Sequence, residues 1–160
     1  MGYAEAHGSI RESPVVQVEL LIRAPSSQLF EAFVEPAMIT KFWLARASAR
    51  LEPGARVRWD FVVKGASTEI EVKELVKDTK IVTEWDQGER VEWSFAPRAE
   101  AETLVGITHS RINGDADAAV TKALDSTQGF TLVLCELKAL LERGVRLNLM
   151  HDKFPDAQYQ

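Results

Sequence analysis

Residues 18–43 constrain the fold more than any other segment, because a strand pattern there runs directly into two short helical patterns. The apolar side chains alternate with the period of a β-strand at Val18, Leu20 and Ile22. Pro25 cannot continue a hydrogen-bond ladder, so the strand must end there, and apolar residues then recur at helical spacing. Pro36 divides this helical stretch. The segment therefore predicts one strand followed by two short helices.

Apolar and polar residues alternate in six further runs between residues 45 and 111, and each run is bounded by turn residues. The runs cover residues 45–51, 56–61, 68–73, 81–86, 90–95 and 103–109. Such one-sided alternation is typical of an antiparallel sheet with one solvated and one buried face. The strand positions on the buried side of the sheet are rich in aromatic side chains, so another element must cover this face.

Residues 126–143 provide that cover as a predicted amphipathic helix. Its apolar stripe consists of Phe130, Val133, Leu134, Leu137, Leu140 and Leu141. Gly144 is suited to the helix C-cap, and residues 116–124 are predicted to form a short helical segment before the main helix. We therefore predict an α+β helix-grip fold, in which an antiparallel sheet of about seven strands curls around a long C-terminal helix. Two short helices join its first and second strands.

The composition predicts a single domain without a membrane span. Its 160 residues fit one domain, which we place at 14–150, with a disordered tail at 1–13 and a polar tail at 151–160. A net charge of −5 argues against nucleic acid as a partner. The single Cys135 excludes an internal disulfide, and histidine and cysteine spacing predicts neither a metal nor a cofactor. The expected location is the cytoplasm.

Five sequence blocks carry a family resemblance. In chain order they are RAPSSQLFEAFVEPAMITKFW, LEPGARVRWDF, KIVTEWDQG, ETLVGITHS and GFTLVLCELKALLERG. Together they resemble the family similar to the activator of the heat-shock protein 90 ATPase, in the START-like SRPBCC superfamily, and a bacterial subgroup within it. The resemblance covers residues 15–145. The chain departs from the family pattern at Ala55, where a second glycine is common, and at Phe42, where paired tryptophans are common.

The resemblance implies a cavity between sheet and helix that binds a small apolar or aromatic molecule. The candidate lining residues are Phe42, Trp59, Phe61, Trp85, Trp93, Phe95, His109, Phe130 and Leu134. The alternative is that these rings fill the core. Two other functions stay open: a co-chaperone-like module that binds a chaperone, and an enzyme of the cyclase, dehydratase or hydrolase kind. A homodimer is a further possible assembly.

His109 is the single weak catalytic candidate, because the other histidines, His7 and His151, fall in the predicted tails. Its side chain is expected on the same side of the strand as those of Val105 and Ile107, near the rim of the cavity. The sequence suggests no serine-histidine-acid set, and an enzyme would need a carboxylate that converges on His109. A binding protein is therefore favoured over an enzyme.

Overall fold

The computed structural model describes residues 13–160, so the predicted disordered tail, residues 1–13, lies outside the described residues except for its last one. The strands are β1 (Val16–Ile22), β2 (Arg46–Ala47), β3 (Arg56–Asp60), β4 (Ser67–Val76), β5 (Lys80–Glu84), β6 (Arg90–Ala99) and β7 (Glu102–Ser110). The helices are α1 (Ser26–Val34), α2 (Pro36–Ile39), α3 (Ala116–Arg143) and α4 (Leu149–Lys153), with a 3-10 turn at Asp86–Gly88.

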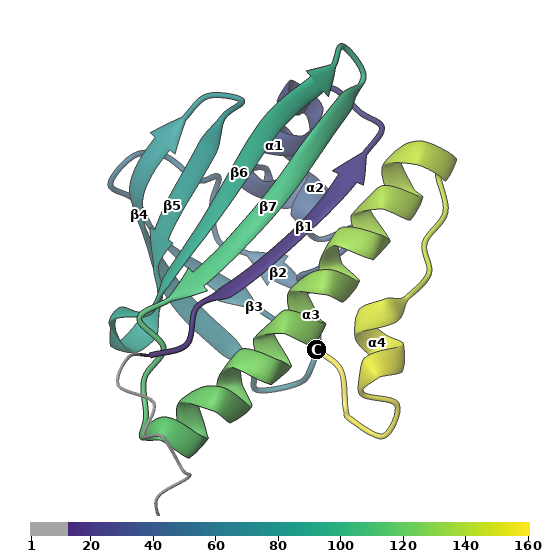
Figure 1. The fold of residues 1–160 in the computed structure, drawn as a ribbon. Coiled ribbons are helices and arrows are strands. Elements are labelled where there is room, and N and C mark those ends of the chain that lie inside the picture. Colours follow the sequence, from purple (N-terminus) through teal and green to yellow (C-terminus); the bar gives the residue numbers. More distant parts are fainter. Residues whose placement is uncertain (1–12) are drawn as a thin grey trace, which may run out of the picture.

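All seven strands form one antiparallel sheet with the order β1-β7-β6-β5-β4-β3-β2 (Figure 1). The first strand pairs with the last, and Val16 lies opposite His109. The sheet curls around α3, which crosses it diagonally, while α1 and α2 connect β1 to β2. The predicted α+β helix-grip fold is confirmed.

The core lies between the inner face of the sheet and the helices. Trp59, Trp93 and Phe95 point inward from β3 and β6 and are almost fully buried, as the strand parity predicts. From α3, Leu134 and Leu137 cover this face. The aromatic rings pack edge-on or tilted rather than in parallel stacks, which suits the charge distribution of their faces and edges.

Two strand predictions were only partly right. The run 45–51 is reduced to the two residues of β2, because the chain leaves the sheet to place Leu51 in the core, where its N–H donates to the Val34 carbonyl. In β5 the burial does not alternate, since Val82 is buried on the opposite face to its neighbours. A register shift in the adjacent strand, between Val72 and Glu74, accompanies this departure.

The long helix is continuous over 28 residues and includes the short helical segment predicted before it. The side chain of Asp115 caps its first turn by accepting a hydrogen bond from the Ala118 N–H at 2.9 Å. Gly144 ends it in the left-handed region, with φ of 66°, as its sequence position predicts. α3 is thus one uninterrupted helix between the Asp115 cap and Gly144.

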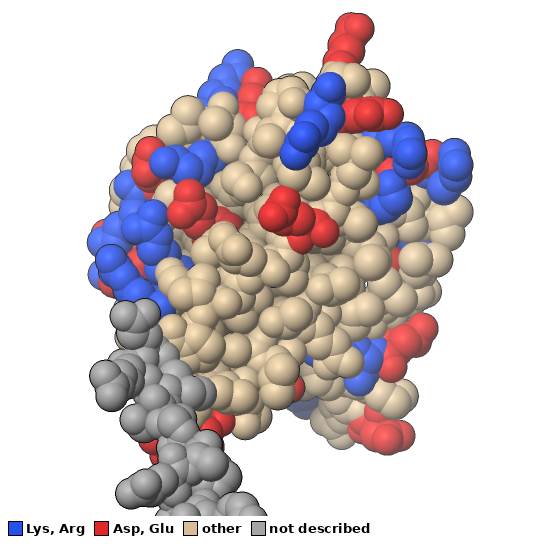
Figure 2. Space-filling model, viewed as in Figure 1, with Lys and Arg blue, Asp and Glu red and all other residues tan. Residues whose placement is uncertain are grey.

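Positive and negative side chains are interspersed over the face shown in Figure 2, and much of this face carries neither. The arginines that cluster in sequence between residues 46 and 58 are paired with acids. Arg46 and Arg58 both contact Asp60, and Arg50 contacts Glu31 and Glu35. These pairs leave no continuous basic stripe from this cluster. No helix among residues 13–160 is long and apolar enough to cross a membrane.

We predict that Leu137→Ala lowers the free energy of unfolding by about 2–5 kcal/mol, because it removes a fully buried side chain from the contact between α3 and the sheet. Urea denaturation measures the change. Leu124→Ala is the matched control on the same helix, since Leu124 is 67% exposed and its truncation should change stability by less than about 0.5 kcal/mol. Equal effects at both positions would contradict the packing described.

Candidate functional site

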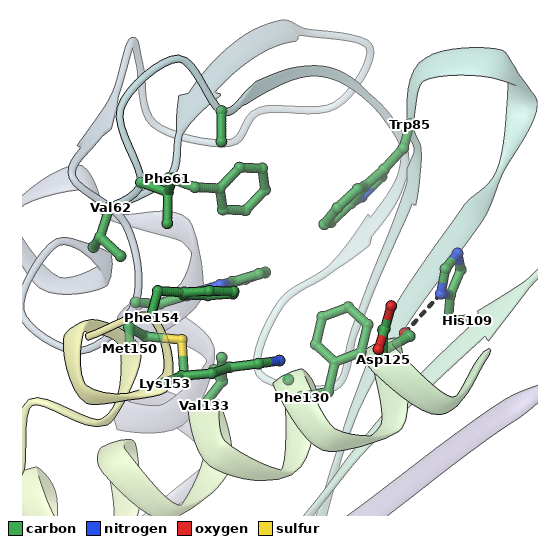
Figure 3. A pocket seen from close by; sticks show the side chains of 15 residues that line it. Phe61, Val62, Trp85, His109, Asp125, Phe130, Val133, Met150, Lys153 and Phe154 are labelled. Atoms are coloured by element: carbon green, nitrogen blue, oxygen red, sulfur yellow. Dashed lines mark hydrogen bonds between the residues drawn. The ribbon is translucent and has the colours of Figure 1, made fainter. Parts of the chain in front are cut away.

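An open pocket of about 500 Å³ lies beside α3. The structure in Figure 3 shows side chains from the sheet, α3 and the C-terminal segment converging on it. Its lining is almost entirely apolar. The lining residues are Trp43, Phe61, Val62, Val63, Ala66, Trp85, His109, Asp125, Ser126, Gly129, Phe130, Val133, Met150, Lys153 and Phe154.

Four aromatic side chains form one continuous wall. The ring centroids of Trp43, Phe61, Trp85 and Phe130 lie 5.9–6.4 Å from their neighbours in this group. Trp85 satisfies its own indole N–H by donating to Thr83 Oγ1 at 2.9 Å. Its ring can therefore present an apolar surface to a ligand without an unpaired donor.

The C-terminal segment supplies the facing wall, with Met150, Lys153 and Phe154. The carboxylate of Glu136, buried on α3, holds the start of this segment by accepting hydrogen bonds from the N–H groups of Leu147 at 3.0 Å and Asn148 at 2.8 Å. Residues 151–160, expected as a polar tail, return to the β3–β4 connection. There Val63 pairs with Tyr159.

The end of the chain strengthens this attachment. The Gln160 side-chain amide lies within hydrogen-bond distance of the carbonyl oxygens of Phe61, Val63 and Ala66, and its backbone N–H donates to the Val62 carbonyl. The same connection lines the pocket. The C-terminal residues thus fix two walls of the pocket against each other.

A chain of three polar side chains lies at one edge of the pocket. His109 Nδ1 is 2.8 Å from Ser126 Oγ, and His109 Nε2 is 2.7 Å from Glu89 Oε1 (Figure 3 shows the first contact). An ionised carboxylate can only accept, so Nε2 carries a proton; in the neutral imidazole, Nδ1 then accepts the Ser126 hydroxyl proton. The sequence did not indicate this serine-histidine-acid arrangement, and the structure corrects that reading.

Glu89 is held in place by further donors. Lys122 Nζ lies 3.0 Å from its Oε2, and the Asn113 backbone N–H donates to the same oxygen at 3.3 Å. Burial alone would raise the pKa of Glu89, but hydrogen bonds from Lys122, His109 and Asn113 outweigh it, so that the pKa lies below the ordinary value of 4.5. The carboxylate therefore stays ionised and orients His109.

The sequence-predicted site residues separate into two groups. Phe61, Trp85, His109 and Phe130 lie on the pocket wall. The remaining five do not line it and are packed in the hydrophobic core: Phe42, Trp59, Trp93, Phe95 and Leu134. For these five the core-filling alternative describes their placement, because each residue is at most 3% exposed.

Several pocket residues were missed by sequence reasoning. Trp43 lines the pocket where its neighbour Phe42 was chosen, and Phe42 instead contacts Phe33 with ring centroids 5.3 Å apart. The sequence does not show which of these two adjacent aromatic residues lines the pocket and which one packs in the core. Ser126 lies one turn before Phe130 on the same helix face, so its position could be found from the sequence. Glu89 falls between the predicted strand runs 81–86 and 90–95, where no pattern indicates its partners. Among the described residues, no group of three or more potential ligand side chains could hold a metal ion.

The family model for the Activator of Hsp90 ATPase homolog 1-like protein matches residues 23–142. The chain belongs to this family. The match runs from just after β1 to the last turn of α3, so it includes six of the seven strands and the pocket wall formed by the sheet and α3, but not the C-terminal segment that forms the other wall. No curated protein matches the chain.

Several solved structures of other proteins share the fold of this chain. The protein SSP2350 from Staphylococcus saprophyticus is 24% identical with a TM-score of 0.70, over 84% of this chain and 96% of that one. The Aha1 dimer from Colwellia psychrerythraea is 18% identical with a TM-score of 0.70, over 82% and 98%. DynU16, a putative protein in the dynemicin biosynthetic locus, is 21% identical with a TM-score of 0.68, over 82% and 48%. At these identities the likeness shows the fold alone.

Glu89→Gln should make stability less dependent on acidic pH. A carboxyl whose pKa is lower in the folded than in the unfolded chain binds fewer protons when folded, so its contribution is present above the unfolded pKa of 4.5 and is lost as pH falls through the folded value. The variant lacks this contribution and should be less stable at neutral pH. Urea denaturation between about pH 3 and pH 7 tests this, and an unchanged acid slope would contradict it.

Glu136→Ala should release the connection between α3 and α4. It leaves two N–H groups without their acceptor, which costs about 1–3 kcal/mol in unfolding free energy. Amide hydrogen exchange should accelerate at Leu147, at Asn148 and across α4. Gln128→Ala, at an exposed position of the same helix, is the control and should leave these rates unchanged.

Proposed function

We propose that this protein binds a small apolar or aromatic molecule in the pocket between the sheet and α3. The observation that carries the proposal is a cavity of about 500 Å³ with a continuous aromatic wall. This volume lies within the range of small-molecule sites, about 300–1,000 Å³. The cytoplasmic location expected from the sequence is part of the same proposal.

The packing around the pocket supports binding rather than a simple defect of the core. The neighbouring side chains Trp59, Trp93 and Leu134 are fully buried, so the protein core next to the pocket is well packed. The apolar pocket wall is in contact with water. A ligand that covers it would gain roughly 25 cal/mol for each Å² of apolar surface removed from water. The few polar groups lie together near Ser126, where they could orient one polar end of a ligand.

A neutral aromatic alcohol, 2-naphthalenemethanol, is a suitable first probe. Binding to the folded state alone should raise the melting temperature with increasing probe concentration, and contact with Trp43 and Trp85 should quench tryptophan emission. Ala66→Trp places a large side chain in the pocket and should abolish both effects. Ala101→Trp, in the exposed turn between β6 and β7, is the matched control and should retain both.

If no apolar probe binds, the pocket hypothesis is wrong and a co-chaperone-like role, or assembly into a dimer, becomes the leading hypothesis. A pull-down with a purified chaperone and a measurement of mass in solution would then distinguish these two. The dimeric Aha1 of Colwellia psychrerythraea makes the second measurement worthwhile.

A catalytic role is the second candidate, and the chain from Ser126 through His109 to Glu89 favours it. In this arrangement His109 Nδ1 can take a proton from Ser126, or from a substrate that displaces it, while Glu89 stabilises the positive imidazolium. The reaction class is hydrolysis, dehydration or cyclisation of an apolar substrate. His109 and Ser126 line the pocket, so a bound molecule would meet them directly, with Glu89 behind His109.

His109→Asn separates binding from catalysis. As a binding module, the variant should bind 2-naphthalenemethanol with nearly unchanged affinity, because burial rather than proton transfer holds the probe. As an enzyme, wild-type protein should turn over members of an aryl ester panel with a pH profile set by one titrating group, and both His109→Asn and Ser126→Ala should lose this turnover. Absence of turnover in the wild type, or its persistence in the variants, would exclude this use of His109.

A further inference from the structure

Lys153 brings a positive charge to the apolar pocket. It is the last residue of α4, and its side chain reaches over α3 in Figure 3. Its Nζ lies 5.3 Å from the ring centroid of Phe154 and 3.6 Å from the point where a Cβ on Gly129 would be. The ammonium group therefore lies over the one position on this face of α3 that has no side chain.

The pairing of Lys153 differs from that of the other half-buried lysines. Lys80 contacts Glu74 at 3.0 Å, and Lys138 contacts Glu142 and also donates to the Leu21 carbonyl at 2.9 Å. Within residues 13–160, no carboxylate oxygen lies within 4.0 Å of Lys153 Nζ. Lys153 is thus a half-buried cation on an apolar wall, with only the face of Phe154 near its charge.

This environment is unfavourable for an ammonium group by itself. Partial removal from water weakens its hydration, and a cation–π contact compensates only a small part of that loss. An anionic group on a ligand would restore a charge-assisted hydrogen bond in a setting where water screens it incompletely. Asp125 also lines the pocket, but it is exposed, so water can satisfy its carboxylate without a ligand.

We propose that the ligand of this pocket is an amphipathic anion, with an aromatic or aliphatic body against Trp85 and Phe130 and a carboxylate head on Lys153. This rests on the proposed function and names the class of molecule that the pocket takes. The head lies on the C-terminal segment and the body on the sheet and α3, so both walls contribute to recognition. Gly129 leaves space for the head beside the helix.

Three probes with the same ring system and different heads test the proposal: 2-naphthoate, 2-naphthalenemethanol and 2-naphthylmethylammonium. Titration calorimetry with the wild type should show that the anion binds about 5- to 20-fold more tightly than the alcohol, and the alcohol more tightly than the cation. In Lys153→Met, which keeps an unbranched stem without the charge, the anion should lose this advantage while the affinity for the alcohol stays the same.

Two further variants complete the design. Lys77→Met removes the same net charge from an exposed turn and should preserve the preference for the anion. Asp125→Asn should strengthen binding of the anion more than that of the alcohol, because it removes the negative charge from the pocket. Raising the salt concentration should weaken binding of the anion alone.

Each outcome separates the two proposals. If the alcohol binds as tightly as the anion, the inference about Lys153 is wrong and the pocket remains a binding site for neutral molecules. A preference for the cation that disappears in Asp125→Asn would also overturn it. Equal losses for all probes in Lys153→Met would mean that the lysine acts through packing rather than charge. If no probe binds, the proposed function itself fails.

Discussion

Burial of the sheet's aromatic inner face under α3 organises the rest of the molecule. Along its C-terminal half, Leu134 and Leu137 press directly onto the strands and complete a close-packed core. In its N-terminal half, small residues such as Ser126 and Gly129 line the pocket, which opens there. Because the helix is continuous, both halves keep a fixed orientation. The depth of the pocket is therefore set by the same contact that stabilises the fold.

The sequence predicted the fold well because the signals for it are local. Strand parity placed Trp59 and Phe95 inside, and the helical stripe together with Gly144 located the covering helix and its end. The pocket was predicted only in part. Parity tells which face a side chain occupies, but it does not tell whether neighbouring side chains fill the space above it. Pairings between distant residues, such as Val63 with Tyr159, give no periodic signal at all.

The polar edge of the pocket shows the same limit. Ser126, His109 and Glu89 come from a helix, a strand and a loop, and only the tertiary structure brings them together. Lys122 and Asn113 hold the Glu89 carboxylate in place. The fixed carboxylate in turn orients the imidazole of His109 toward Ser126. An apolar wall and a directed polar chain are separate features of one pocket. A ligand can use the first without engaging the second.

The pairing of β1 with β7 has a consequence for how the protein reaches its folded state. Among residues 13–160, β1 pairs with no strand on its other side, and its partner lies about ninety residues later, as Val16 and His109 show. During synthesis β1 therefore remains without its partner until most of the chain has been made. Contacts of such high sequence separation close slowly, since the entropy of a long loop must be lost first. Until β7 is available, the unpaired edge of β1 can therefore pair with other chains.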